Sequence, residues 1–101
     1  MTGKTGILLC GHGSRDANAI KEFAVLAEML DARLTDYDVD HGFLEFATPI
    51  IRTGLNALQK KGNTNILALP GMLFAAGHVK NDIPTVLNTY MAQNPGVTVQ
   101  Y

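Results

Sequence analysis

The chain of 101 residues has one cysteine, no tryptophan and no excess of charge of either sign. With Cys10 alone, it has neither a disulfide framework nor the paired cysteines of a structural zinc site. Eight Lys and Arg against nine Asp and Glu give a net charge of -1, whereas nucleic-acid-binding domains normally carry a basic excess. We therefore expect a protein that does not bind nucleic acid.

Long apolar runs are also missing. No run approaches the roughly 20 residues that a membrane-spanning helix needs. The segment from Met1 to Gly6 lacks the charged, apolar and cleavage regions of a secretory signal. A single unpaired cysteine is ordinary in a reducing compartment. We expect a cytoplasmic protein with no membrane partner.

Short apolar runs alternate with segments of helical period, which is typical of strands alternating with helices. Hydrophobic residues make up 47% of the chain, enough for one domain with a modest core. The expected strands are 5–10, one within 33–46, 65–69 and 97–101; the expected helices are 16–30, 49–61 and 82–93. This β-α-β-α-β-α-β order predicts the α/β class: an open, mostly parallel four-stranded sheet with helices on both faces.

Short polar residues, proline and glycine mark the predicted helix ends. Ser14 or Asp16 is expected to cap the first helix. Thr48 is expected to be the N-cap of the second helix, with Pro49 at its first position and Gly62 at its end. Spacings of three and four residues predict these buried helix positions: Ile20, Phe23, Ala24, Ala27, Leu30, Ile51, Leu55, Leu58, Ile83, Leu87, Tyr90 and Met91.

No helix follows the last predicted strand, 97–101. A parallel sheet needs both faces covered. We therefore expect either a partner subunit that completes the cover or a single domain, 1–101, that is truncated or forms half of a longer protein. The longer chain is the favoured interpretation, and a homodimer or pairing with a second half-domain is expected.

The carboxyl ends of parallel strands are where α/β sheets bind ligands, near the point at which the strand order reverses. Polar residues follow the first three predicted strands at this edge, and an apolar loop lies beside them. The polar residues are His12, Ser14, Arg15, Glu45 and His78, and the loop contains Met72, Leu73 and Phe74.

Two of the three histidines suit a ligand site. His12 lies between glycines that allow a sharp turn and leave the imidazole open. His78 follows Gly77 in a loop that is too apolar for simple exposure to solvent. His41 lies about 13 Å before the end of its strand and is interpreted as structural.

Each other candidate has a structural alternative. Desolvation by Leu44 and Phe46 would raise the pKa of Glu45 and suit it to proton transfer, although it also fits a partner for the next helix terminus. Arg15 suits a carboxylate or phosphate clamp, and equally a solvated helix residue. The apolar loop suits either the edge of the core or a flat apolar ligand.

Two imidazoles and a carboxylate suit a divalent ion such as Co²⁺, Fe²⁺, Ni²⁺ or Zn²⁺. Only two strong ligands are visible, whereas a structural zinc site needs four. Such an incomplete set of ligands suits an ion that the protein holds briefly and then transfers to another molecule.

Three motifs in order resemble those of the sirohydrochlorin chelatases, the small cobaltochelatase and ferrochelatase group of the cobalamin and sirohaem pathways. They are Gly11-His-Gly-Ser-Arg15, Phe43-Leu-Glu-Phe46 and Ala76-Gly-His-Val-Lys-Asn-Asp-Ile-Pro84, each following a predicted strand. The resemblance covers nearly the whole chain and implies a chelatase-like fold.

The resemblance implies a lyase that inserts Co²⁺, or Fe²⁺, into sirohydrochlorin without ATP or an organic cofactor. His12 and His78 fall on the family's metal-binding and catalytic histidines, and Glu45 on its acidic residue. The metal would be a substrate. Five residues are candidates for binding the tetrapyrrole: Ser14, Arg15, Leu73, Phe74 and Lys80.

Two other functions stay open from the residues alone. One is a metal or tetrapyrrole carrier or half-domain that binds without turnover. The other is phosphoryl transfer on His12, although histidine phosphatases prefer arginine where this chain has Gly11. Ser14 does not fit a nucleophile elbow, since His12 and Asp16 replace its glycines, and no P-loop is present.

Overall fold

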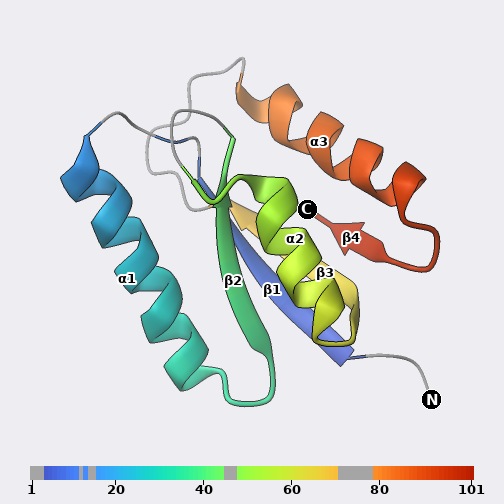
Figure 1. Ribbon diagram of the computed structural model, residues 1–101, viewed down its shortest axis with the longest axis horizontal. Coiled ribbons are helices and arrows are strands. Elements are labelled where there is room, and N and C mark those ends of the chain that lie inside the picture. The colour runs from blue at the N-terminus through green and yellow to red at the C-terminus, as the bar shows by residue number, and fades with distance from the viewer. Residues whose placement is uncertain (1–3, 12, 14–15, 45–47, 71–78) are drawn as a thin grey trace.

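The computed structural model describes residues 4–11, 13, 16–44, 48–70 and 79–101, with the backbone alone described at 70 and 79–82. Within these residues four strands form a parallel sheet in the order β2-β1-β3-β4 (Figure 1). The predicted α/β fold is confirmed. The elements are β1 (Lys4–Gly11), α1 (Ala17–Arg33), β2 (Asp38–Phe43), α2 (Ile51–Lys60), β3 (Asn63–Pro70), α3 (Val79–Gln93) and β4 (Thr98–Gln100).

Helices cover both faces of the sheet, as predicted. Side chains alternate between the two faces along a strand, so Leu8 and Leu9 of β1 point in opposite directions. Leu8 belongs to the core formed with α2 and α3. Leu9 is in register with His41 of β2, whose ring meets Phe23 of α1. Figure 1 accordingly shows α1 on the other side of β2 from α2 and α3.

The main core lies between the sheet and the two helices α2 and α3. The predicted helix faces are confirmed here: Leu55, Leu58 and Ile83 have no exposed surface. Burying one leucine or isoleucine side chain contributes about 2 kcal/mol. The core cluster is Leu8, Cys10, Ile51, Leu55, Leu58, Ile66, Ala68, Ile83, Leu87, Tyr90, Val97 and Val99.

The opposite face is only partly covered in the described part of the chain. Ile7 and Leu9 of β1 are 6% and 5% exposed, but Leu67 and Leu69, their partners on β3, are 38% and 42% exposed. No helix among the described residues is both long and apolar enough to cross a membrane.

The second helix begins later than the sequence predicts. The N-cap is Ile50, not Thr48, and Pro49 lies outside the helix. The reason is a pairing that local capping signals do not reveal. Phe43 donates its N–H to the carbonyl of Pro49 at 2.8 Å and forms a parallel bridge with Ile50, which keeps residues 49–50 extended.

The third helix begins earlier than expected, at Val79 instead of about Asp82. Pro84 therefore lies inside the helix, where a proline cannot donate a hydrogen bond to the carbonyl four residues earlier, that of Lys80. The first helix is capped by Asp16, whose Oδ1 accepts from the N–H of Asn18 at 2.9 Å. Ser14, the other candidate cap, lies outside the described residues.

A glycine lets α2 approach the end of β2 closely. A Cβ atom at Gly42 would lie 2.5 Å from the Cα of Ile51 and 2.8 Å from the carbonyl oxygen of Ile50. Any side chain at position 42 would therefore push the start of α2 away from the sheet. This contact places the first turn of α2 over the carboxyl end of β2.

Asn63 joins three elements at the opposite end of the sheet. It is fully buried, and β3 begins with it, two residues before the predicted start. Its Nδ2 donates to the carbonyl of Leu58 and to Oδ2 of Asp38, both at 2.8 Å. The bond from Asn63, together with Lys4 at 3.0 Å, lowers the pKa of the Asp38 carboxyl.

We predict that Asn63→Ala lowers the free energy of unfolding by about 2 kcal/mol, because it leaves two acceptors without their buried donor. Urea denaturation measures this loss. Asn65→Ala, at an exposed position on the same strand, is the matched control and should change the stability by less than about 0.5 kcal/mol. Equal losses in the two variants would contradict the role given to Asn63.

Candidate functional site

Three strand ends lie side by side at the carboxyl edge of the sheet. Gly11 at the end of β1 is in register with Phe43 of β2, and Cys10 is in register with Pro70 of β3. Neighbouring strands are about 4.8 Å apart. The strand order reverses between β1 and β3, where α/β sheets form their ligand crevices.

The predicted site residues lie in the connections that follow these strand ends. His12 is the next residue after β1, Glu45 comes two residues after β2, and His78 immediately precedes α3. The side chains of all eight predicted site residues lie outside the described part of the structure, with Lys80 placed by its backbone in α3. They are His12, Ser14, Arg15, Glu45, Leu73, Phe74, His78 and Lys80.

The described backbone beside these positions contains a glycine turn and a hydrogen bond between two strand ends. Gly13 has a φ of 105°, a left-handed conformation that glycine adopts without strain. Leu44 donates its N–H to the carbonyl of Gly11 at 2.8 Å. The chain that leaves β2 is therefore hydrogen-bonded to the end of β1, so the segments carrying His12 and Glu45 start from adjoining points.

His41 packs against α1, in agreement with a structural role, but β2 ends at Phe43, so His41 lies two residues before the strand end, about 7 Å and not the expected distance of about 13 Å. It lies on β2 against α1, with its ring centroid 6.0 Å from that of Phe23 and 5.5 Å from that of Phe43. Its side chain is 18% exposed, and its Nδ1 lies 3.8 Å from Oδ1 of Asp40. This histidine fills the space between α1 and the sheet.

Cys10 is close to the edge but is not suited to ligate a metal. The residue has no exposed surface, and burial raises the pKa of its thiol to about 12. The thiolate is the form that binds metals and attacks electrophiles. Among the described residues, no group of three or more His, Cys, Asp and Glu side chains is arranged to hold a metal ion.

We predict that the Cys10 thiol does not react with a disulfide reagent in the folded protein. At pH 8 a thiol with a pKa of about 12 is ionised in only about one molecule in 10⁴. The release of thionitrobenzoate from Ellman's reagent measures the reaction, with urea-unfolded protein as the control. Equal rates in folded and unfolded protein would contradict the burial of Cys10.

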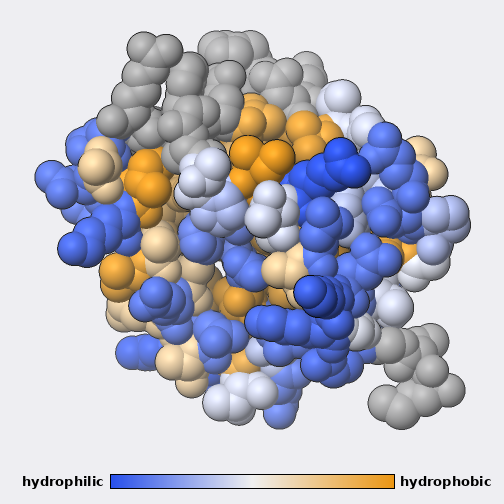
Figure 2. Space-filling view, viewed as in Figure 1, coloured by the Kyte–Doolittle hydropathy of each residue, from blue (hydrophilic) through white to orange (hydrophobic). Residues whose placement is uncertain are grey.

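An apolar margin that was not predicted from the sequence borders the carboxyl edge of the sheet. Figure 2 shows hydrophobic side chains gathered around the start of α2. Ile50 lies there and is 44% exposed. No local pattern in the sequence indicates this, because Ile50 is placed by its pairing with Phe43 at the end of β2. Such a margin suits a ligand with a flat apolar surface.

Comparisons with known proteins agree with this fold. The CbiX family model matches residues 6–101. The sirohydrochlorin ferrochelatase of Bacillus subtilis (strain 168) is 37% identical over 98 residues, which are 97% of this chain and 38% of that protein. The sirohydrochlorin cobaltochelatase of Methanococcoides burtonii is 32% identical over 96 residues, which are 95% of this chain and 73% of that protein.

A solved structure shows the same arrangement. The sirohydrochlorin chelatase SirB from Bacillus subtilis subspecies spizizenii, in complex with cobalt, superposes with a TM-score of 0.84 at 36% identity. The match covers 95% of this chain and 41% of SirB. The chain thus spans less than half the length of the Bacillus proteins and about three quarters of the Methanococcoides protein.

Proposed function

The chain belongs to the CbiX family, and from this premise we propose that it inserts Co²⁺, or Fe²⁺, into sirohydrochlorin without ATP. The observation that carries the proposal is the sheet order β2-β1-β3-β4, which makes β1 and β3 neighbours. His12 follows β1, and His78 ends the connection that follows β3. The chelatase names of the relatives supply the metals and the macrocycle.

The two histidines are proposed to hold the metal substrate. Two imidazole nitrogens bound to one ion at about 2.1 Å lie within about 4.2 Å of each other. The connections that carry the two histidines begin at adjacent strands. These strands lie about 4.8 Å apart, which supports such an approach. Two protein ligands leave the rest of the coordination sphere open for the nitrogens of the macrocycle.

A base is needed because the metal replaces protons. One divalent cation enters the macrocycle and two pyrrole N–H protons leave, so the net charge of the macrocycle is unchanged. The carboxylate of Glu45 or a neutral histidine accepts these protons. Glu45 suits this task because its segment is hydrogen-bonded to the end of β1, beside His12.

The remaining residues are proposed to hold the tetrapyrrole. Its peripheral carboxylates suit the cations Arg15 and Lys80, with Ser14 donating a further hydrogen bond. Leu73 and Phe74 pack against the flat face of the ring, and the exposed side chain of Ile50 extends this apolar surface.

We also propose that the active form is a homodimer or a pair of half-domains in the cytoplasm. The Bacillus relative supports pairing, because the match covers only 38% of its length and so leaves room for a second unit of this size. The free thiol of Cys10 fits a reducing compartment.

We predict that His12→Ala and His78→Ala each lower the rate of Co²⁺ insertion by about 100-fold or more, because each removes a metal ligand and proton acceptor. Anaerobic absorption spectroscopy of sirohydrochlorin with Co²⁺ measures the rate. His41→Gln is the matched control and should keep the activity, since His41 packs under α1.

A His78→Ala variant with wild-type activity would exclude His78 as an essential ligand. If the protein binds Co²⁺ and sirohydrochlorin but forms no product, the chelatase proposal fails and a non-catalytic carrier or half-domain takes its place.

We further predict that the activity falls as the pH drops below about 6.5, where ordinary imidazoles take up protons and cease to bind metals. Initial rates at saturating Co²⁺, corrected for spontaneous insertion, measure the profile. A rate that is constant between about pH 5 and about pH 8 would argue against ligation by histidine.

A further inference from the structure

A groove between α2 and α3 has no role in the proposed metal site. The groove has a volume of about 220 Å³, whereas the proposed mechanism acts at the strand ends.

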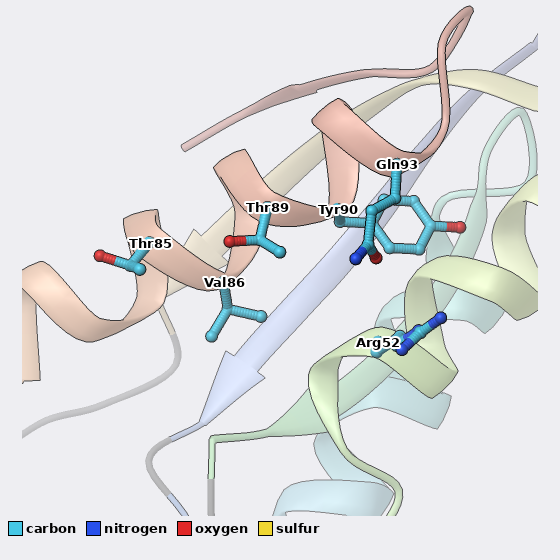
Figure 3. A pocket seen from close by; sticks show the side chains of 6 residues that line it. All are labelled: Arg52, Thr85, Val86, Thr89, Tyr90 and Gln93. Carbon is cyan, nitrogen blue, oxygen red and sulfur yellow. The ribbon is translucent and has the colours of Figure 1, made fainter.

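The groove is lined by one side chain from α2 and five from α3, all drawn in Figure 3. They are Arg52, Thr85, Val86, Thr89, Tyr90 and Gln93.

The groove has an apolar part and a charged part. Val86 projects from α3 toward α2, and the ring of Tyr90 forms a second apolar wall (Figure 3). The guanidinium of Arg52 extends from α2 along the groove toward Tyr90 and Gln93. The donors of Arg52 and the amide of Gln93 therefore lie toward the same end.

The positive charge of Arg52 is not neutralised within the described part of the chain. The ion pair described there joins Lys4 to Asp38, and no described carboxylate is seen to pair with Arg52. Burial raises the pKa of Tyr90, and the charge of Arg52 partly opposes this rise, as expected for a guanidinium near the phenol.

The phenol of Tyr90 is held in place and is not itself a free donor. Its oxygen lies 2.8 Å from Oδ1 of Asn56 and 2.7 Å from Oε1 of Gln59, both on α2. These contacts fix the spacing of the two helices and so the width of the groove. Arg52 then presents its guanidinium at the end of a preformed, mostly apolar slot.

We propose that this groove binds a small organic carboxylate. The apolar body of the ligand lies against Val86 and the ring of Tyr90, and its carboxylate accepts hydrogen bonds from Arg52 and Gln93. Arginine suits this role because its planar fork donates two parallel hydrogen bonds to one carboxylate. The volume of 220 Å³ accommodates one aromatic ring or a short aliphatic chain.

Such a carboxylate has two possible sources. One is a free acid, and the other is a peripheral carboxylate arm of the tetrapyrrole, which rests on the proposed function. The fold supports the second source, because α3, which lines the groove, begins directly after His78.

An NMR titration with benzoate tests the groove without any chelatase assay. Benzoate should shift the amide signals of Thr89, Tyr90 and Gln93 in a saturable way, whereas benzyl alcohol, which lacks the charge, should not. Arg52→Gln should weaken benzoate binding by about tenfold or more, the usual effect of losing a charge-assisted hydrogen bond. Lys60→Gln, which removes another exposed cation of α2, should leave binding unchanged.

Three results would overturn the proposal: equal shifts with benzyl alcohol, unchanged binding in Arg52→Gln, or groove shifts that follow the protein concentration and not benzoate. The last would identify the groove as a contact between copies of the chain.

Steady-state kinetics distinguishes the two sources once benzoate binding is established. A KM for sirohydrochlorin that rises about tenfold in Arg52→Gln, at unchanged kcat, identifies the tetrapyrrole arm. An unchanged KM identifies a free acid. If the protein proves to have no chelatase activity, the benzoate titration still decides whether the groove binds a carboxylate.

Discussion

The parallel pairing of β1 with β3 is the constraint on which the rest of the structure depends. It runs from Lys4 with Asn63, through a shift in register at Thr5, to Cys10 with Pro70, and it leaves β2 on the other side of β1. A parallel ladder aligns the carboxyl ends of its strands, so the connections after β1, β2 and β3 leave from one edge. Two of these connections carry the histidines of the proposed metal site, and the third carries its carboxylate.

The packing of α2 holds that edge in place. Gly42 lets the first turn of α2 lie on the end of β2, and Asn63 ties the last turn of α2 to the other end of the sheet. Tyr90 then joins α3 to α2 through Asn56 and Gln59. The core thus sets the position of α3, the helix that begins directly after His78.

Much of this fold could be predicted from the sequence because its signals are local. The apolar run of β1 and the spacing of Leu55 with Leu58 identify buried elements without reference to the rest of the chain. The errors arose where distant residues decide the outcome. Threonine is a residue type that is common at N-caps, so Thr48 was expected to cap α2. The pairing of residues 49–50 with Phe43 instead makes the helix begin at Ile51.

The site was predictable only in part, for the same reason. The strand ends that carry its residues follow from periodicity. The structural role of His41 was also expected, although His41 lies only two residues before the end of β2. The groove at Arg52 had no local signal, since Arg52 and Gln93 are brought together only by the packing of two helices. Likewise, Ile50 gains its exposure from a tertiary bridge.

X-ray absorption spectroscopy of the Co²⁺-loaded protein tests the central claim most directly. If the β1–β3 pairing brings His12 and His78 onto one ion, the spectrum contains the scattering of two imidazole rings with nitrogens at about 2.1 Å. A coordination shell of oxygen atoms alone, or one that contains sulfur from Cys10, would contradict the account.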